Sequence, residues 1–211
     1  MTAYTLTVLN QATTFENFAV YQNDPDLGVQ NVMSLAWFVK GAHPNTKVWF
    51  DWDLSYSFQW CENGSVTKGV VFKASEDWPC NPADVNSNAV ALDYQDNAFL
   101  FRSGPLMITP QLGNLYINHL STNPVDVGSV ALAVGGKPAY ATGSQPNQMD
   151  VWTPHPNYWI TAGTYEAGVA LDTEEVSSRA AQVAYAPGVF DMTVEFTHNR
   201  NWNIYPTPVS S

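Results

Sequence analysis

Apolar and polar residues alternate without a break over residues 47–60. Apolar side chains occupy one parity of this stretch, and the other parity is polar except at Trp49. Side chains with a period of two can be buried together only if the backbone is extended. The apolar set comprises Val48, Phe50, Trp52, Leu54, Tyr56, Phe58 and Trp60. The pattern predicts one long strand in an all-β protein with antiparallel β-sandwich architecture.

Turn sequences such as Asn63-Gly64 and Gly135-Gly136 recur along the chain and favour short strands about every ten residues. The exception is the stretch 32–40, where apolar residues have helical spacing. Asn31 is suited to cap its start and Gly41 its end. We therefore expect one short helix near 32–40.

Two parts of the chain repeat each other. His43-Pro44-Asn45 recurs as His155-Pro156-Asn157, and the apolar stretches 18–21 and 130–133 are related by the same offset of 112 positions. Stacking two related units would cover the sheet face that each unit leaves bare. The repeat predicts two related sandwich-like halves, 1–104 and 113–205, which share a core and are followed by a flexible tail at 206–211.

Composition restricts the classes of function. Hydrophobic residues make up 45% of the chain and charged residues only 13%, as in compact globular sheets. The net charge of −11 opposes binding to nucleic acid. No apolar run approaches the roughly 20 residues of a transmembrane segment. The N-terminus lacks the pattern of a signal peptide, which predicts a cytoplasmic protein, with non-classical export as the alternative.

The polar face of the 47–60 stretch is the first candidate site. Trp49, Asp51 and Asp53 share this face, and an indole beside carboxylates suits a glycan or another small polar ligand. The alternative for Trp49 is coverage by a second sheet or a partner subunit. The two carboxylates, spaced ~7 Å apart along a strand, also fit the acid and base of a hydrolase.

His43 and His155 are a second candidate site. Their place in the repeat suggests that a pseudo-twofold axis brings both imidazoles to one divalent metal ion, with His119 and His198 as further ligands. The alternative is that each histidine lies in a turn and no metal binds. Two groups of residues offer oxygen atoms that could bind calcium: Asn23, Asp24 and Asp26 form one group, and Asp172, Glu174 and Glu175 form the other. We interpret them as turns and solvated charges rather than calcium ligands.

Cys61 and Cys80 are the two cysteines of the chain. A disulfide between them would stabilise the fold by ~3 kcal/mol. Free thiols fit the sequence equally well, because a reducing compartment would leave both cysteines unpaired. Neither a serine nucleophile elbow nor a phosphate-binding glycine loop occurs in the chain.

Several short stretches carry a resemblance to a known family. The stretches are Val20-Tyr21-Gln22, residues 32–38, Tyr56-Ser57-Phe58, Trp78-Pro79 and residues 155–161. Along nearly its whole length the chain resembles the RhiA family of rhizosphere-expressed bacterial proteins. The resemblance implies a soluble bacterial protein associated with plant roots, whose expression follows population density. It implies no catalytic residue.

These observations favour a non-catalytic binding or structural protein that recognises a glycan or small polar ligand. A carboxylate- or metal-dependent hydrolase is one alternative, and a membrane-lesion protein that inserts exposed aromatic residues is another. Sheet edges and surplus aromatic residues also suggest a homodimer.

Overall fold

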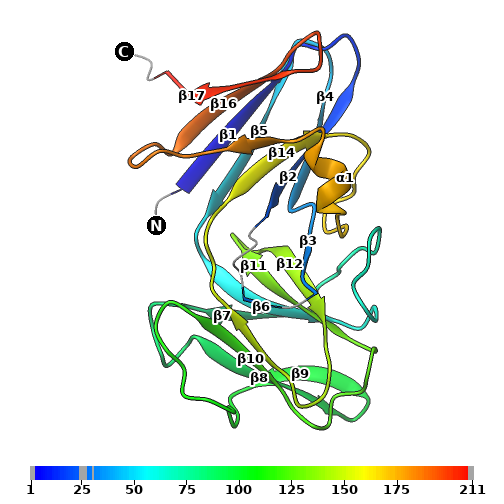
Figure 1. Ribbon diagram of the computed structural model, residues 1–211, viewed down its shortest axis with the longest axis vertical. Helices are drawn as coiled ribbons and strands as arrows, with labels where there is room; N and C mark the ends of the chain where they lie inside the picture. The colour runs from blue at the N-terminus through cyan, green and yellow to red at the C-terminus, as the bar shows by residue number, and fades with distance from the viewer. Residues whose placement is uncertain (1–2, 24–27, 30, 209–211) are drawn as a thin grey trace.

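The computed structural model describes residues 3–23, 28–29 and 31–208, and within them the chain forms two stacked sandwiches (Figure 1). Four sheets follow one another along the long axis of the molecule. Sheets I and II form the upper sandwich of Figure 1, and sheets III and IV form the lower one. The prediction of an all-β sandwich protein is confirmed.

The upper sandwich takes its strands from both ends of the chain. Sheet I has the order β17-β16-β1-β5, and sheet II has the order β15-β14-β2-β4. The bounds are β1 (Ala3–Asn10), β2 (Glu16–Gln22), β4 (Phe38–Ala42), β5 (Thr46–Asp53), β14 (Tyr158–Ala162), β15 (Ala181–Val183), β16 (Asp191–Phe196) and β17 (Trp202–Pro206).

The lower sandwich is built mainly from the middle of the chain. Sheet III has the order β3-β12-β11-β6-β7, and sheet IV has the order β13-β10-β8-β9. The bounds are β3 (Met33–Ser34), β6 (Tyr56–Cys61), β7 (Glu76–Cys80), β8 (Ala89–Gln95), β9 (Ala98–Arg102), β10 (Leu115–His119), β11 (Ser129–Val134), β12 (Lys137–Gly143) and β13 (Met149–Trp152).

The two sandwiches have the same strand arrangement. Val20 of β2 pairs with Ile160 of β14, and Leu132 of β11, 112 positions after Val20, pairs with Phe58 of β6. The outer sheets match as well, because each has a parallel pair at its centre, β1 with β16 in sheet I and β10 with β8 in sheet IV. The strands correspond as β1 to β10, β2 to β11, β4 to β12, β5 to β13, β6 to β14, β7 to β15, β8 to β16 and β9 to β17.

This correspondence means that the two predicted halves exchange strands. The stretch 1–104 contributes β1, β2, β4 and β5 to the upper sandwich and β3 and β6–β9 to the lower one. The stretch 113–205 contributes β10–β13 to the lower sandwich and β14–β17 to the upper one. Neither half is a sandwich by itself. One hydrophobic cluster spans both sandwiches, from Leu6 and Phe50 in the upper to Phe58 and Leu92 in the lower. Of the predicted tail, Pro206 pairs with Met192, and residues 209–211 lie outside the described part.

The 47–60 stretch forms two strands rather than one. Phe50, Trp52, Phe58 and Trp60 of its apolar parity are buried as predicted, but Leu54 is exposed. It lies where β5 ends at Asp53 and before β6 begins at Tyr56 in a different sandwich. The Asp53 Oδ1 atom accepts hydrogen bonds from the backbone N–H of Ser55 at 2.9 Å and from its hydroxyl at 2.5 Å. An aspartate that accepts a backbone N–H two residues ahead favours a turn, which ends the strand there.

The helix predicted near 32–40 is wrong. The stretch contains β3 and the start of β4, and the single helix in the described residues is α1 (Thr173–Ser177), which Asp172 caps. Leu35, Ala36 and Trp37 are consecutive and fully buried, yet each belongs to a different hydrophobic cluster. Extended backbone sends successive side chains to opposite faces, whereas a helix would place this stretch against one surface.

Candidate functional site

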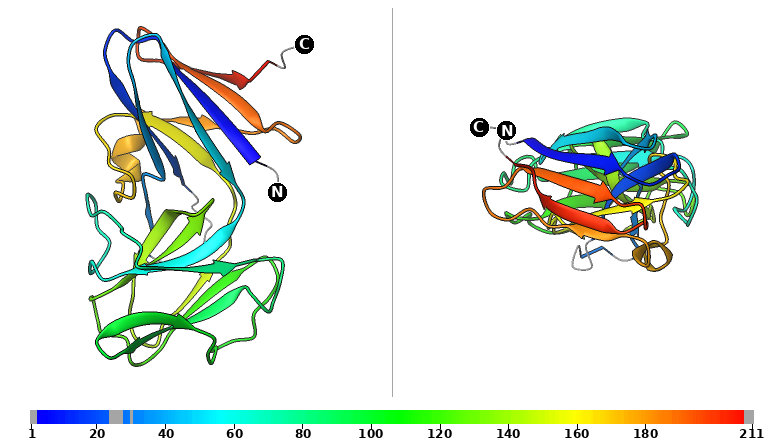
Figure 2. Two further views of the ribbon diagram at one scale, coloured as in Figure 1. Left: turned by 180° about the vertical axis from the view of Figure 1, so that it is seen from behind. Right: turned by 90° about the horizontal axis from the view of Figure 1, so that it is seen from above.

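The outward side of sheet I is a broad polar surface that no described segment covers. Seen from above, β1, β16 and β17 lie in front of the other strands (Figure 2). Inward residues such as Leu6 and Val194 are fully buried, so their neighbours along each strand point outward. We call this surface the open face; its side chains are Thr5, Thr7, Leu9, Lys47, Trp49, Asp51, Asp191, Thr193, Glu195, Asn203 and Tyr205.

Trp49 is the most unusual residue of the open face. It is 56% exposed, although the strand that carries it is otherwise polar on this side. The expectation that a second sheet covers it is wrong for the described residues. The Lys40 ammonium donates a hydrogen bond to the Trp49 carbonyl oxygen, which holds the backbone of this edge strand. The indole is therefore presented to solvent from a fixed backbone.

Three carboxylates lie on the open face. The Thr5 hydroxyl donates to the Asp51 Oδ1 atom at 3.2 Å, and the Tyr205 hydroxyl donates to the Glu195 Oε1 atom at 2.8 Å. With the exposed Asp191, the open face carries three carboxylates and a single ammonium, that of Lys47. The open face is therefore acidic.

Asp53 lies at the lower margin of the open face, where a shallow cavity of about 520 Å³ meets the β11–β12 hairpin. Asp51 lines the same cavity, so the structure keeps both predicted carboxylates together. The hydrogen bonds from Ser55 hold the pKa of Asp53 below its usual value. A general acid needs a carboxyl with a raised pKa, so this shift opposes Asp53 as the general acid of a hydrolase.

The equivalent face of sheet IV is covered. Tyr116, Asn118 and Ala91 occupy the positions that Thr5, Thr7 and Thr193 hold in sheet I, and each is at most 4% exposed. The chain segment 103–114 lies over them. The Asn118 Nδ2 atom donates to the Pro105 carbonyl oxygen at 2.5 Å, and the Tyr116 hydroxyl accepts the backbone N–H of Gln111 at 3.1 Å.

The structure does not bring His43 and His155 together. His43 follows Ala42, which pairs with the first residue of β2, whereas His155 precedes Tyr158, which pairs with the last residue of β2. A strand of this length separates the two histidines by ~20 Å or more. His43 contacts the Phe15 ring at a centroid distance of 5.0 Å. The predicted equivalence fails because one His-Pro-Asn follows β4 and the other follows β13.

Nothing in the described residues supplies another metal site. No cluster of three or more His, Cys, Asp or Glu side chains there is arranged to hold a metal ion. Asp172 and Glu175 form ion pairs with Lys68 at the start of α1. Of the other oxygen group, Asp24 and Asp26 lie outside the described residues. A divalent metal remains a prediction of the sequence alone.

Cys61 and Cys80 are both buried and both free. Cys80 pairs with Tyr56 in the β6–β7 ladder, so five residues of β6, or ~16 Å, separate it from Cys61. A disulfide requires Cα atoms within about 7 Å. The structure therefore agrees with the free-thiol alternative and not with the disulfide, because the cysteines lie at opposite ends of one hairpin.

Sequence reasoning missed a buried polar network in the lower sandwich. The His119 Nδ1 atom is 2.9 Å from the Ser144 hydroxyl, and the Nε2 atom is 2.9 Å from the Asp150 carboxylate. Gln148 donates to the other oxygen of Asp150 at 2.5 Å. Ser144 is fully buried and His119 is 1% exposed. A serine nucleophile must reach its substrate, so we interpret this network as a structural part of the core.

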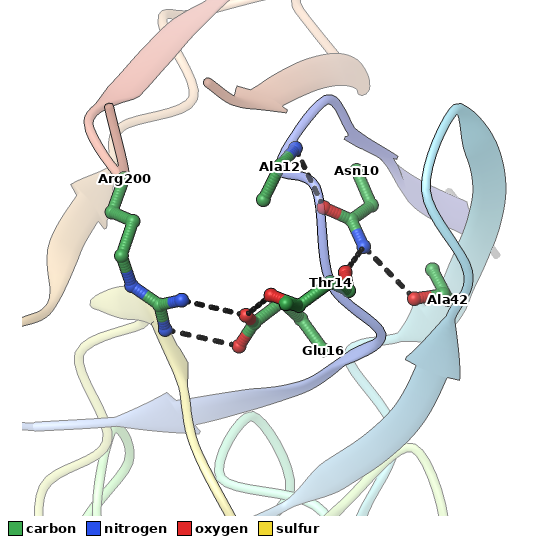
Figure 3. A network of polar contacts seen from close by, with 6 residues as sticks. All are labelled: Asn10, Ala12, Thr14, Glu16, Ala42 and Arg200. Atoms are coloured by element: carbon green, nitrogen blue, oxygen red, sulfur yellow. Dashed lines mark hydrogen bonds and ion pairs between the residues drawn. The ribbon is translucent and has the colours of Figure 1, made fainter. Parts of the chain in front are cut away.

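A second polar network fixes the far end of the upper sandwich (Figure 3). Arg200, in the β16–β17 turn, donates to both oxygens of Glu16 at 2.7 and 3.1 Å. The Thr14 hydroxyl donates to the same carboxylate at 2.7 Å, and the Asn10 side chain closes the adjacent β1–β2 turn. This ion pair ties sheet II to the hairpin of sheet I that carries Tyr205, and so supports the open face.

Comparisons with known proteins bear on the whole chain. The RhiA family model matches residues 1–207. The chain is 29% identical over 211 residues to the protein RhiA of Rhizobium leguminosarum bv. viciae, and the match covers 97% of this chain and 87% of that protein. No solved structure matches the chain. The single helix of the described residues is too short to cross a membrane.

Proposed function

This chain belongs to the RhiA family, and we propose that it acts as a non-catalytic recognition protein of a plant-associated bacterium. The binding surface is the open face of sheet I, and the ligand is a glycan or a similar polyhydroxylated molecule. The proposal rests on one observation above all, the exposed indole of Trp49 on an uncovered sheet face.

The chemistry of the open face suits hydroxyl-rich ligands. An exposed indole offers a flat apolar surface, and the carbon face of a sugar ring can pack against it. Carboxylates accept hydrogen bonds from sugar hydroxyls, and threonine hydroxyls both donate and accept. Asp51 and Thr7 stand directly beside Trp49 on β5 and β1. A site built on strands also holds its groups more precisely than one built on loops.

The test is a titration of the intact protein with a panel of oligosaccharides, followed by tryptophan fluorescence and calorimetry. We expect Trp49→Ala to weaken the binding of the recognised sugar about tenfold or more, because it removes the central stacking surface. Leu112→Ala is the matched control, since Leu112 is 63% exposed but lies in the segment over sheet IV. Equal losses in both variants, or no loss in Trp49→Ala, would refute the proposal.

The same material separates recognition from hydrolysis and from dimerisation through the open face. Asp51→Asn with unchanged sugar binding but lost turnover would identify a hydrolase. A second copy seated on the open face would cover Trp49 instead of a ligand. Sedimentation of wild type and Trp49→Ala across a range of concentrations distinguishes that outcome, because a dimer through this face dissociates in the variant.

A further inference from the structure

The open face carries a second aromatic residue in register with Trp49. On β5, β1, β16 and β17 the residues paired in one row are Trp49, Thr7, Thr193 and Tyr205. Neighbouring strands lie ~4.8 Å apart, so three spacings place the two aromatic residues ~14 Å apart across the sheet. One sugar ring is too short to contact both, whereas a short oligosaccharide is long enough.

The Tyr205 end of this row is held in place. The Tyr205 ring is fixed by its hydrogen bond to Glu195, and Thr193 bonds to the Thr207 hydroxyl at 2.8 Å. The hairpin that carries Tyr205 is anchored by the ion pair of Arg200 with the buried Glu16. A preorganised surface loses less side-chain entropy when it binds a ligand.

Charge narrows the class of ligand. Asp51, Asp191 and Glu195 flank the row, against Lys47 on the open face and Lys40 at the edge of β5. The whole chain carries a net charge of −11. Uronate-containing, sulfated or phosphorylated chains would meet like charges across the sheet, which costs affinity. The hydroxyl groups of an uncharged sugar can instead donate hydrogen bonds to these carboxylates.

We propose that the open face binds an uncharged oligosaccharide of three or more sugar units that lies across the strands, with Trp49 and Tyr205 stacked against separate units. The inference rests on the proposed function and adds its ligand class and its direction on the sheet. Thr7 and Thr193 lie beneath the middle of the bound oligosaccharide and exchange hydrogen bonds with its hydroxyl groups.

The experiment measures the binding of uncharged glucose, mannose and xylose oligomers of one to six units to the full chain by calorimetry. Uronate oligomers of matched length serve as the anionic comparison. We expect affinity to rise with length up to the span of the row and the uronate oligomers to bind at least tenfold more weakly. Tyr205→Ala should weaken binding of the longest neutral oligomer about tenfold without changing binding of the single sugar.

Tyr205→Phe keeps the ring and loses only the bond to Glu195, so it should retain affinity within about twofold. Near-ultraviolet circular dichroism confirms that each variant is folded. If Trp49→Ala loses binding and Tyr205→Ala does not, or if single sugars bind as tightly as oligomers, the proposed function survives and this inference fails. Tighter binding of the uronates also overturns it. Absence of binding to every oligomer refutes both.

Discussion

Sheets I and IV hold equivalent places in the two sandwiches, yet only one presents its outer face to solvent. Sheet IV lies beneath the segment 103–114, and its outward Tyr116 and Asn118 are nearly fully buried. Sheet I presents Thr5 and Thr7 at the same positions and adds Trp49 beside them. The frame does not require an exposed outer face, so the exposed face of sheet I calls for a functional explanation.

The cores of the two sandwiches also differ at equivalent positions. Register places Val8, Ala42 and Phe50 of the upper sandwich where the lower one has His119, Ser144 and Asp150. The upper trio is apolar and buried, and the lower trio is hydrogen-bonded and buried. A buried polar group is tolerated only when its partners are present. The same strand arrangement thus accommodates either an apolar or a hydrogen-bonded polar trio in its core. The polar trio is stable only when all three of its residues are present.

The largest effect should come from breaking the polar trio. His119→Ala leaves the Asp150 carboxylate and the Ser144 hydroxyl without their shared partner, and we expect a loss of about 3–5 kcal/mol in the free energy of unfolding. Val8→Ala, the equivalent change in the apolar trio, should cost about 2 kcal/mol. Urea denaturation measures both.

The two sandwiches can also be made alike. The triple variant His119→Val, Ser144→Ala and Asp150→Phe imports the upper trio and should recover part of the loss of His119→Ala, since no polar group is left unpaired. A His119→Ala variant less perturbed than Val8→Ala would contradict this account of the core.

A smaller effect should follow from lifting the cover of sheet IV. A Cβ atom on Gly104 would lie 2.9 Å from the Ala91 Cβ atom, and Ala91 is fully buried. Gly104→Val should therefore cost about 1–3 kcal/mol and speed amide exchange in 103–114. Gly143→Ala is the control, because the nearest atom to its added Cβ is 4.0 Å away. Unchanged exchange in Gly104→Val would show that the segment is not packed as described.

The smallest effect concerns the anchor of the open face. Burial alone would raise the pKa of the Glu16 carboxyl, but hydrogen bonds from Arg200 and Thr14 outweigh it, so the pKa lies below its usual value. Such a carboxylate stabilises the fold above its unfolded pKa of about 4.3, and this contribution is lost as the pH falls through the lower folded pKa.

Glu16→Gln should thus destabilise the protein by about 1–2 kcal/mol at pH 7, and the difference from wild type should shrink in acid below pH ~4. The exposed Glu62→Gln is the control, for which we expect no change. Thermal denaturation from pH 3 to pH 7 makes the comparison, and a constant difference across that range would argue against the ion pair.

The local pattern of the sequence predicts which side chains are buried, but it does not predict that the two halves of the chain exchange strands between the sandwiches. The parity of Phe50, Trp52 and Phe58 predicted which side chains are buried, and the polar parity singled out Trp49. The pattern does not determine which strands pair with each other, because a strand has the same alternation in either sandwich. The spacing of Leu35 and Ala36 matched a helix by chance, and tertiary burial on two sides held the stretch extended.

The candidate site residues also divide into those that the local sequence identifies and those that only the fold brings together. Trp49 is recognisable from the sequence because it is the one apolar residue on the polar parity of 47–60. Asp51 is recognisable because it shares that parity. His119, Ser144 and Asp150 come from β10, β12 with its following loop, and β13, and only the folded register brings them together. His43 and His155 repeat a tripeptide but not a structural position, since short identities carry no information on register.

The most direct test of the central claim is an amide and indole NMR titration of the full chain with an oligosaccharide that binds it. The account predicts shift changes confined to β1, β5, β16 and β17, with the Trp49 indole N–H among the largest. Shift changes centred instead on the cavity lined by Asp126, Gln145 and Asp150 in the lower sandwich would contradict it and move the recognition site away from the open face.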